Sequence, residues 1–213
     1  MQHPVFTACV TQIRIWVAEN ARTLRRFLSA LQAGISIPEL EIFELERNYN
    51  RKDLENFLTE KTRLGPVGMV SEAGIPGMAD PGSEVAAWGH AHNCRVIPVT
   101  GPSSVFLALS ASGLNGQDFH FHGYPPIDEK EMKARLTRIS AKSPTTHIYI
   151  ETPYRSDRFL QMLLHALPAH TKLCIAAELH ASDGFIRTQT VAAWKLSGTV
   201  IGKRPAVFLL GTP

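Results

Sequence analysis

The first half of the chain alternates short apolar runs with amphipathic segments. Residues 13–17 alternate apolar and polar side chains, which predicts a strand. Leu24, Phe27, Leu28 and Leu31 then follow the i, i+3, i+4, i+7 spacing of a helix whose other face is polar. Further strands of this half are predicted over residues 40–45, 66–70 and 95–100. This alternation predicts a mostly parallel sheet with helices on both faces.

Two positions predict where helices of this half begin. Asn50 stands before a segment with apolar residues at helical spacing and is a suitable N-cap. Asp80 precedes Pro81, and an Asp followed by Pro is typical of an N-cap and the first helical residue. We therefore expect helices to start near residues 51 and 81.

The pattern changes near residue 121. Gly123 is followed by two prolines that interrupt regular structure, so the expected domains are residues 1–121 and residues 122–213. The second half has fewer helices for each strand, which favours a mixed sheet. Its predicted helices cover residues 128–140 and a segment around 159–167, and its predicted strands cover residues 147–150, 172–177, 185–191 and 205–210.

Two loops rich in glycine, proline and serine, which we call the bare loops, each follow a predicted strand of the first half. Residues 71–77 and residues 101–104 have few large side chains, so their backbone is open to a ligand. Loops at the carboxyl ends of parallel strands meet in one crevice, and we expect these two loops to share a ligand site. Taken alone, the first loop is explained equally well as a turn that needs glycine for positive φ.

Composition and length exclude several classes of protein. The chain has 213 residues, enough for two domains, and 44% of them are hydrophobic, yet no apolar run approaches the ~20 residues that span a bilayer. The start of the chain lacks the basic cluster and apolar core of a secretory signal. Three widely spaced cysteines predict neither a disulfide framework nor a metal site. A cytoplasmic protein fits best, and no membrane partner is expected.

The net charge of +3 is small, but the basic residues are grouped. Such groups either bind phosphates or form the solvated faces of amphipathic helices, and the second explanation is the more common one. The groups are Arg22, Arg25 and Arg26; Arg47, Arg51 and Lys52; and Lys130, Lys133, Arg135 and Arg138.

Residues 70–82, V-S-E-A-G-I-P-G-M-A-D-P-G, resemble the V-S-D-A-G-T-P-x-x-x-D-P-G signature of a bacterial methyltransferase family. That family modifies a cytidine ribose 2′-hydroxyl of 16S ribosomal RNA and is a branch of the tetrapyrrole-methylase superfamily. Similar blocks follow in the family's order at residues 99–103, 108–114, 121–125, 150–155 and 177–179. The resemblance implies two α/β domains with a cofactor cleft between them, S-adenosylmethionine as the methyl donor, and a homodimer.

The chain departs from the family pattern at several places that bear on the substrate. The family's A-E-D-T-R-x-T is A-E-N-A-R-T-L at residues 18–24, its V-S-D ends in Glu72, and its K-G-E is K-R-P at residues 203–205. The family's first strand and its P-x-G-N loop have no match before Ile13. Either the chain start is incomplete or residues 1–9 stand in for that strand, because a sheet without it has an exposed edge.

The resemblance also implies which residues form the site. Expected cofactor contacts are Ser71, Gly74, Ile75, Met78, Asp80, Ser103, Ser104, Tyr154, Leu179 and Pro205. Asp80 either meets the cofactor's ammonium group or acts only as an N-cap. Glu19 and Glu178 are candidate bases, or alternatively hydrogen-bond acceptors at strand ends. Arg22 and Arg155 are candidate phosphate holders, because a guanidinium stays charged.

The resulting hypothesis is an enzyme that transfers a methyl group directly to a ribose hydroxyl of small-subunit ribosomal RNA. Direct displacement needs the acceptor oxygen in line with the methyl–sulfur bond, and no nucleophile–base pair is required. The expected partner is ribosomal RNA or the small ribosomal subunit. Two alternatives remain: methylation of a tetrapyrrole or other small molecule on the same fold, and a non-catalytic cofactor-binding module.

Overall fold

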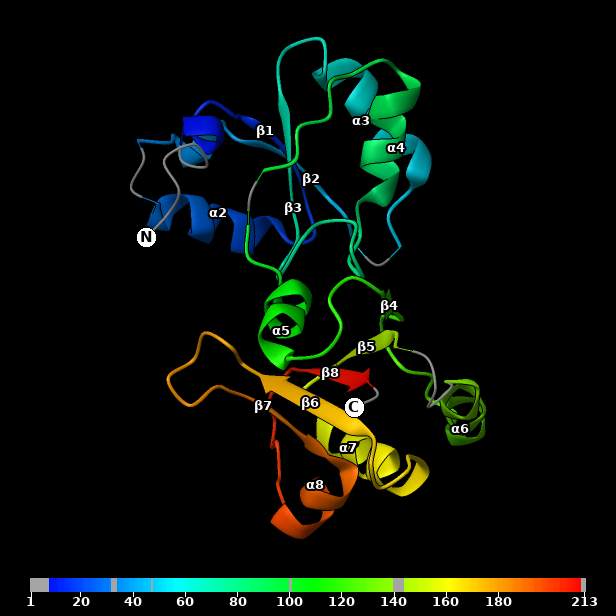
Figure 1. Ribbon diagram of the computed structural model, residues 1–213. Helices are drawn as coiled ribbons and strands as arrows, with labels where there is room; N and C mark the ends of the chain where they lie inside the picture. Colours follow the sequence, from blue (N-terminus) through cyan, green and yellow to red (C-terminus); the bar gives the residue numbers. More distant parts are fainter. Residues whose placement is uncertain (1–7, 32–33, 47, 100, 140–143, 212–213) are drawn as a thin grey trace. The chain divides into compact units, whose positions relative to one another are not determined.

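A computed structural model describes residues 8–31, 34–46, 48–99, 101–139 and 144–211 of the chain (Figure 1). The chain divides into two units, Met1–Pro102 and Ser103–Pro213. This division lies earlier in the sequence than the expected boundary at residue 121. The difference has a physical cause: strand β4 (Phe119–Phe121) pairs with a strand of the second unit, and α5 (Ser104–Ser112) packs on that unit's sheet.

The first unit is built on three parallel strands in the order β2-β1-β3. Ile15 pairs with Glu41 on one side and with Val67 on the other, so all three strands end level with Ala18. The strands are β1 (Ile15–Ala18), β2 (Glu41–Glu44) and β3 (Val67–Val70); the helices are α2 (Ala21–Ala30), η1 (Ile37–Glu39), α3 (Arg51–Lys61) and α4 (Ser83–Ala91).

Alternate residues of β1 face opposite layers of helix. Trp16 packs in one cluster with Leu24 and Leu28 of α2, while Val17 packs in another with Leu54 and Leu58 of α3. The predicted parallel sheet with helices on both faces is thereby confirmed. Asn50 is the N-cap of α3, as predicted, and its side chain accepts a hydrogen bond from the backbone N–H of Lys52 at 2.9 Å.

The predicted start of the next helix at Asp80 is wrong. Helix α4 begins at Ser83, and its N-cap is Gly82 with φ 123°. Ala79 has φ 63° and Gly77 has φ 79°, so the chain makes further turns before the helix can begin. The Asp-Pro pair is a local signal, and the conformation of the loop overrides it.

The predicted strand over residues 95–100 is also not observed. Residues 95–99 have no regular structure and, within the described chain, no backbone hydrogen bond to β3; Thr100 lies outside the described residues. The outer edge of β3 is therefore unpaired, and Ile97 is 59% exposed. Residues 8–10 are helical, so residues 8 and 9 do not form the expected substitute strand, and residues 1–7 lie outside the described chain.

The second unit is a mixed sheet, as predicted, with five strands among the described residues in the order β4-β5-β8-β6-β7. β4 is parallel to β5, and every other pair is antiparallel. Its further strands are β5 (Thr146–Glu151), β6 (Lys172–Ala177), β7 (Phe185–Thr190) and β8 (Ala206–Gly211); its further helices are α6 (Glu129–Arg138), α7 (Ser156–Ala166) and α8 (Val191–Ser197).

One large apolar cluster forms the core of the second unit. It joins one face of the sheet, including Tyr149 and Phe208, to α6, α7 and α8. Helix α8 was not predicted: Thr190 caps it, and the buried Trp194 donates from Nε1 to the carbonyl of Leu173 at 2.8 Å. In the described part of the chain, no helix combines the length and apolarity that a membrane span requires.

Candidate functional site

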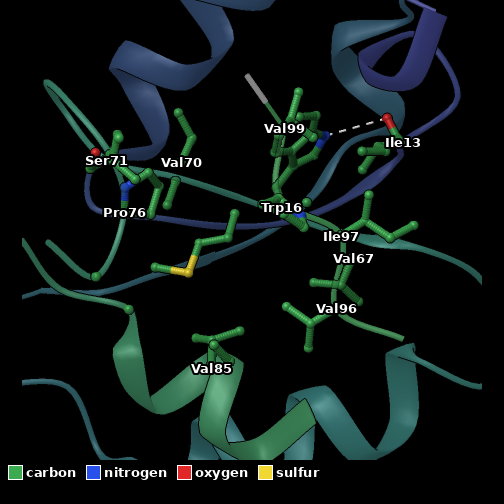
Figure 2. A pocket seen from close by; sticks show the side chains of 18 of the residues that line it. Ile13, Trp16, Val67, Val70, Ser71, Pro76, Val85, Val96, Ile97 and Val99 are labelled. Atoms are coloured by element: carbon green, nitrogen blue, oxygen red, sulfur yellow. Dashed lines mark hydrogen bonds between the residues drawn. The ribbon is translucent and has the colours of Figure 1, made fainter. Parts of the chain in front are cut away.

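An open cavity of about 1750 Å³ lies in the first unit, alongside the unpaired edge of β3 (Figure 2). Val67 of β3 and Val85 of α4 line it, and so do Val96 and Ile97 of the segment that runs past β3. Trp16 contributes its ring, which is held by a 3.3 Å hydrogen bond from Nε1 to the carbonyl of Ile13. Most of the wall is therefore apolar.

The polar part of the wall lies at the carboxyl ends of two neighbouring strands. Glu19 directly follows β1, and Ser71 and Glu72 directly follow β3. Because the two strands are parallel and end level, these residues lie at the same edge of the sheet. A Glu19 carboxylate oxygen accepts a hydrogen bond from the backbone N–H of Glu72 at 3.0 Å. Glu19, Ser71 and Glu72 all line the cavity. This contact joins residues that are far apart in the sequence.

Residues from both bare loops line this cavity, but Ser103 and Ser104 of the second loop do not. Residues 73–77 line it with a backbone that bends at Gly74, φ 84°, and at Gly77, φ 79°. Gly101 and Pro102 line it as well. A β-carbon added at Gly101 would meet no heavy atom within 4 Å, so the backbone there is accessible. Glycines at these bends leave the backbone of this part of the wall open to a ligand.

Asp80 lies in the first loop but is not among the cavity-lining residues. Burial, together with the nearby negative charge of Glu19, raises the pKa of the Asp80 carboxyl group. A β-carbon added at Gly74 would lie 3.8 Å from one Asp80 carboxylate oxygen, which places this group beside the bare loop. Asp80 does not cap α4, and its side chain instead forms a hydrogen bond with Ser71, which partly opposes the rise in its pKa.

The other predicted residues of the first unit have distinct surroundings. Ser71, Gly74 and Ile75 line the cavity, and Met78 does not. Arg22, with Arg25 and Arg26, is exposed on α2 on the side away from the core. Asn20, which stands where the family has Asp, caps α2 by accepting a hydrogen bond from the N–H of Thr23 at 3.0 Å.

In the second unit, two of the predicted residues are joined directly. The backbone N–H of Glu178 donates to the carbonyl of Pro205 at 3.4 Å, and Leu179 follows Glu178 in the chain. Glu178 has φ 46°, and its carbonyl oxygen would lie 1.9 Å from a β-carbon added at Gly184. Glycine is therefore required at position 184 to allow this bend.

Other predicted residues of the second unit are positioned by individual contacts. Tyr154 is 83% exposed, and Lys203 Nζ lies 6.0 Å from its ring centre. Arg155 pairs with the buried carboxylate of Glu151 at 3.0 Å. Ser103 is buried at the N-cap of α5, and Ser104 is the first residue of that helix.

Sequence reasoning missed the apolar wall of the cavity. Val96, Ile97 and Val99 belong to a short apolar run like that of a buried strand, so no local signal distinguishes them from one. No group of three or more His, Cys, Asp or Glu side chains in the described residues is arranged to hold a metal ion.

No protein-family model matches the chain. The chain is 36% identical over 129 residues to ribosomal RNA small subunit methyltransferase I of Mesorhizobium japonicum, which is 60% of this chain and 43% of that protein. It is 31% identical over 201 residues to the protein of the same name from Synechocystis sp., which is 92% of this chain and 69% of that protein. The chain thus spans about half the length of the first curated relatives that it matches.

Solved structures with a similar fold include methyltransferases. The methyltransferase CobJ matches with a TM-score of 0.61 at 15% identity, over 99% of this chain and 93% of CobJ. Uroporphyrin-III C-methyl transferase from Thermus thermophilus, complexed with S-adenyl homocysteine, matches with a TM-score of 0.54 at 14% identity, over 96% of this chain and 88% of that protein. At such low identity these matches show the fold, and the Synechocystis relative shows the closer kinship. The chain belongs to the ribosomal RNA small subunit methyltransferase I family.

Proposed function

We propose that the protein is an S-adenosylmethionine-dependent methyltransferase that modifies a ribose hydroxyl of small-subunit ribosomal RNA. The observation that carries this proposal is family membership, because the curated relatives are named as methyltransferases of that RNA. The match to a methyltransferase bound to S-adenyl homocysteine, the donor after loss of its methyl group, supports the choice of cofactor.

The cavity of the first unit has the chemistry that such a donor needs. Its volume of about 1750 Å³ is larger than the several hundred Å³ of typical small-molecule sites, and its apolar wall can pack against an adenine ring. Glu19 and Asp80 place negative charge near the bare loop, which favours a ligand that carries an ammonium group and a sulfonium. The backbone around Gly74 and Gly101 is accessible for hydrogen bonds. The remaining predicted contacts, Ser103, Ser104, Tyr154, Leu179 and Pro205, belong to the second unit.

The cofactor supplies an electrophilic methyl group, and the protein has to position the acceptor and remove its proton. Glu19 is our first candidate base, because it is fixed at the end of β1 by its bond to the Glu72 N–H. A positioned base accelerates proton removal by roughly 10²–10⁴-fold. Arg22, exposed in the first turn of α2, is placed to hold a phosphate of the RNA. Glu178 is the second candidate base.

Calorimetric titration with S-adenosylmethionine tests the cofactor site. Asp80→Asn should weaken binding, because it removes a negative charge beside the bare loop. Asp53→Asn is the matched control, since Asp53 is exposed on α3 and does not line the cavity. Failure of the unaltered protein to bind the cofactor would overturn the proposal.

Transfer of a labelled methyl group to small ribosomal subunits that lack it tests the reaction. Glu19→Gln should lower the rate at saturating cofactor by about 10²–10⁴-fold if Glu19 is the base. Glu178→Gln, measured in parallel, decides between the two candidates. Unchanged rates for both variants would exclude both carboxylates as bases.

A tetrapyrrole acceptor is the second candidate, favoured by the uroporphyrin and cobalamin enzymes among the structural matches. Salt separates the two: RNA binding through α2 should weaken steeply with salt, and Arg22, Arg25 and Arg26 together replaced by Ala should flatten that dependence. We also propose a cytoplasmic homodimer by family expectation, and light scattering of the purified protein tests the dimer.

A further inference from the structure

Three rings of the second unit form a stack that runs from the core to the surface. Tyr149 is fully buried, His122 is half-buried and His120 is exposed. The rings of Tyr149 and His122 are 4.6 Å apart with 7° between their planes, and those of His122 and His120 are 4.0 Å apart with 5° between their planes. The stack therefore ends in a flat imidazole at the edge strand β4.

The sheet and one hydrogen bond fix the orientation of this stack. His120 and His122 are two residues apart on β4, so their side chains lie on the same face, and His120 is paired with His147 of β5. His122 Nε2 lies 2.9 Å from His147 Nδ1. Burial, followed by the effects of His120 and His147, lowers the pKa of His122 to about 4, so this ring is neutral at pH 7. The outer imidazole is thus supported from below by a rigid, uncharged ring.

The surroundings of the exposed end suit a nucleic acid. In the part of the chain that the structure describes, the ring neighbours of His120 are His122 and His147. Arg135 of α6 is close enough to affect the pKa of both His122 and Tyr149, and its guanidinium is exposed while paired with Glu131 at 2.9 Å. The stack thus ends in an exposed aromatic face, and Arg135 lies near its inner rings. Single-stranded nucleic acids stack bases on such faces and bind nearby cations through their phosphates.

We propose that the outer face of His120 binds an unpaired base of the RNA substrate, and that Arg135 binds an adjacent phosphate. The base becomes the fourth ring of the stack. The His120 ring already stacks on His122, so less ordering is needed when the base binds. This inference rests on the proposed function, because it assigns the RNA to a surface of the second unit.

Fluorescence anisotropy with a labelled single-stranded RNA dodecamer tests the proposal. His120→Ala should weaken binding by about 5- to 150-fold, the range found for loss of one stacked base. His120→Phe keeps a flat ring and should bind within about threefold of the unaltered protein, which also shows that the site tolerates replacement. His170→Ala, at another exposed histidine, is the control and should have no effect.

Two further measurements separate stacking from simple charge attraction. Replacing the stacked nucleotide by an abasic one should weaken binding to the unaltered protein and have little effect on binding to His120→Ala. Arg135→Ala should reduce the salt dependence by about one counterion. Two results would overturn the stacking site. One is that His120→Ala and His170→Ala bind the dodecamer with equal affinity. The other is that RNAs with an abasic nucleotide, tested at each position in turn, all bind as tightly as the intact RNA.

The cofactor titration distinguishes the failure of this proposal from failure of the proposed function. If the protein binds S-adenosylmethionine and methylates small subunits while His120→Ala changes nothing, only the stacking site is wrong. If the unaltered protein fails to bind the cofactor, the proposed function fails, whatever the RNA affinities are.

Discussion

The two units differ in how completely the edges of their strands are paired with neighbouring strands. In the second unit, the central strands β5, β8 and β6 are paired on both sides, and one core cluster of 17 buried residues joins the sheet to three helices. In the first unit, one edge of β3 is unpaired, and Val96, Ile97 and Val99 face the cavity while 42%, 59% and 45% exposed. A short apolar run therefore forms part of the core in one unit and the wall of a cavity in the other.

The largest expected effect comes from truncating the core of the second unit. Phe208 is fully buried and packs edge-on against Phe159 with ring centres 4.9 Å apart. Phe208→Ala should lower the free energy of unfolding by about 3–5 kcal/mol. Phe106→Ala, at a phenylalanine that is 48% exposed on α5, should cost well under half as much. Urea unfolding measures both, and equal losses would contradict the described core.

A smaller loss of stability is expected from a substitution in the cavity wall of the first unit. A β-carbon added at Gly68 would lie 2.6 Å from the Trp16 ring, so Gly68→Ala forces the ring to move. We expect a loss of about 1–3 kcal/mol and a shift in tryptophan fluorescence. Gly65→Ala should be nearly neutral, because nothing lies within 4 Å of the added atom. A neutral Gly68→Ala would show that the wall at Trp16 is not rigid.

Acid should affect the second unit through its imidazole stack. The folded state lowers the pKa of His122 from 6.5 to about 4, and the unfolded chain therefore binds more protons between these values. Stability should be complete above pH 6.5 and fall as the pH drops towards 4, by roughly 1–2 kcal/mol after allowance for solvent screening. Urea unfolding between pH 7 and 4 measures this change. His122→Phe should flatten the curve, and an unchanged slope would exclude His122 as its source.

The smallest losses of stability should come from removing a helix N-cap, and they should be equal in the two units. The side chain of Asn20 accepts a hydrogen bond from the N–H of Thr23 at 3.0 Å, and that of Asp128 accepts one from the N–H of Glu131 at 2.9 Å. Replacing either cap by Ala should cost about 1 kcal/mol. Hydrogen exchange, followed separately for α2 and α6, would locate each loss. A much larger loss at Asn20 would mean that the cavity depends on the start of α2.

Elements with strong local signals were predictable from the sequence. β6 was predicted over residues 172–177, its observed bounds, because a continuous apolar run is limited at both ends by polar residues. The end of α5 also has a strong local signal, because Gly113 follows it with a left-handed φ of 71° that glycine adopts easily. The start of α4, the seven residues of α8 and the absent strand at 95–99 depend on the loop conformation or on neighbours that the local pattern does not contain.

The candidate site was predictable in part. Local composition identified both bare loops, and the parallel sheet placed the first beside Glu19. The bond from Glu72 to Glu19 spans 53 residues of sequence and requires β1 to lie next to β3. The spacing of His120 and His122 predicts that they share a face, but only the register with β5 brings Tyr149 and His147 into contact with them.

The unpaired edge of β3 makes one wall of the cavity more selective than its side chains suggest. Main-chain donors and acceptors along such an edge repeat about every 6.6 Å, and each one that loses its solvent without a replacement costs about 1–3 kcal/mol. A hydrocarbon of the right shape would fill the volume and still be rejected. An occupant that lies against β3 must carry its own alternating polar groups in register with the strand.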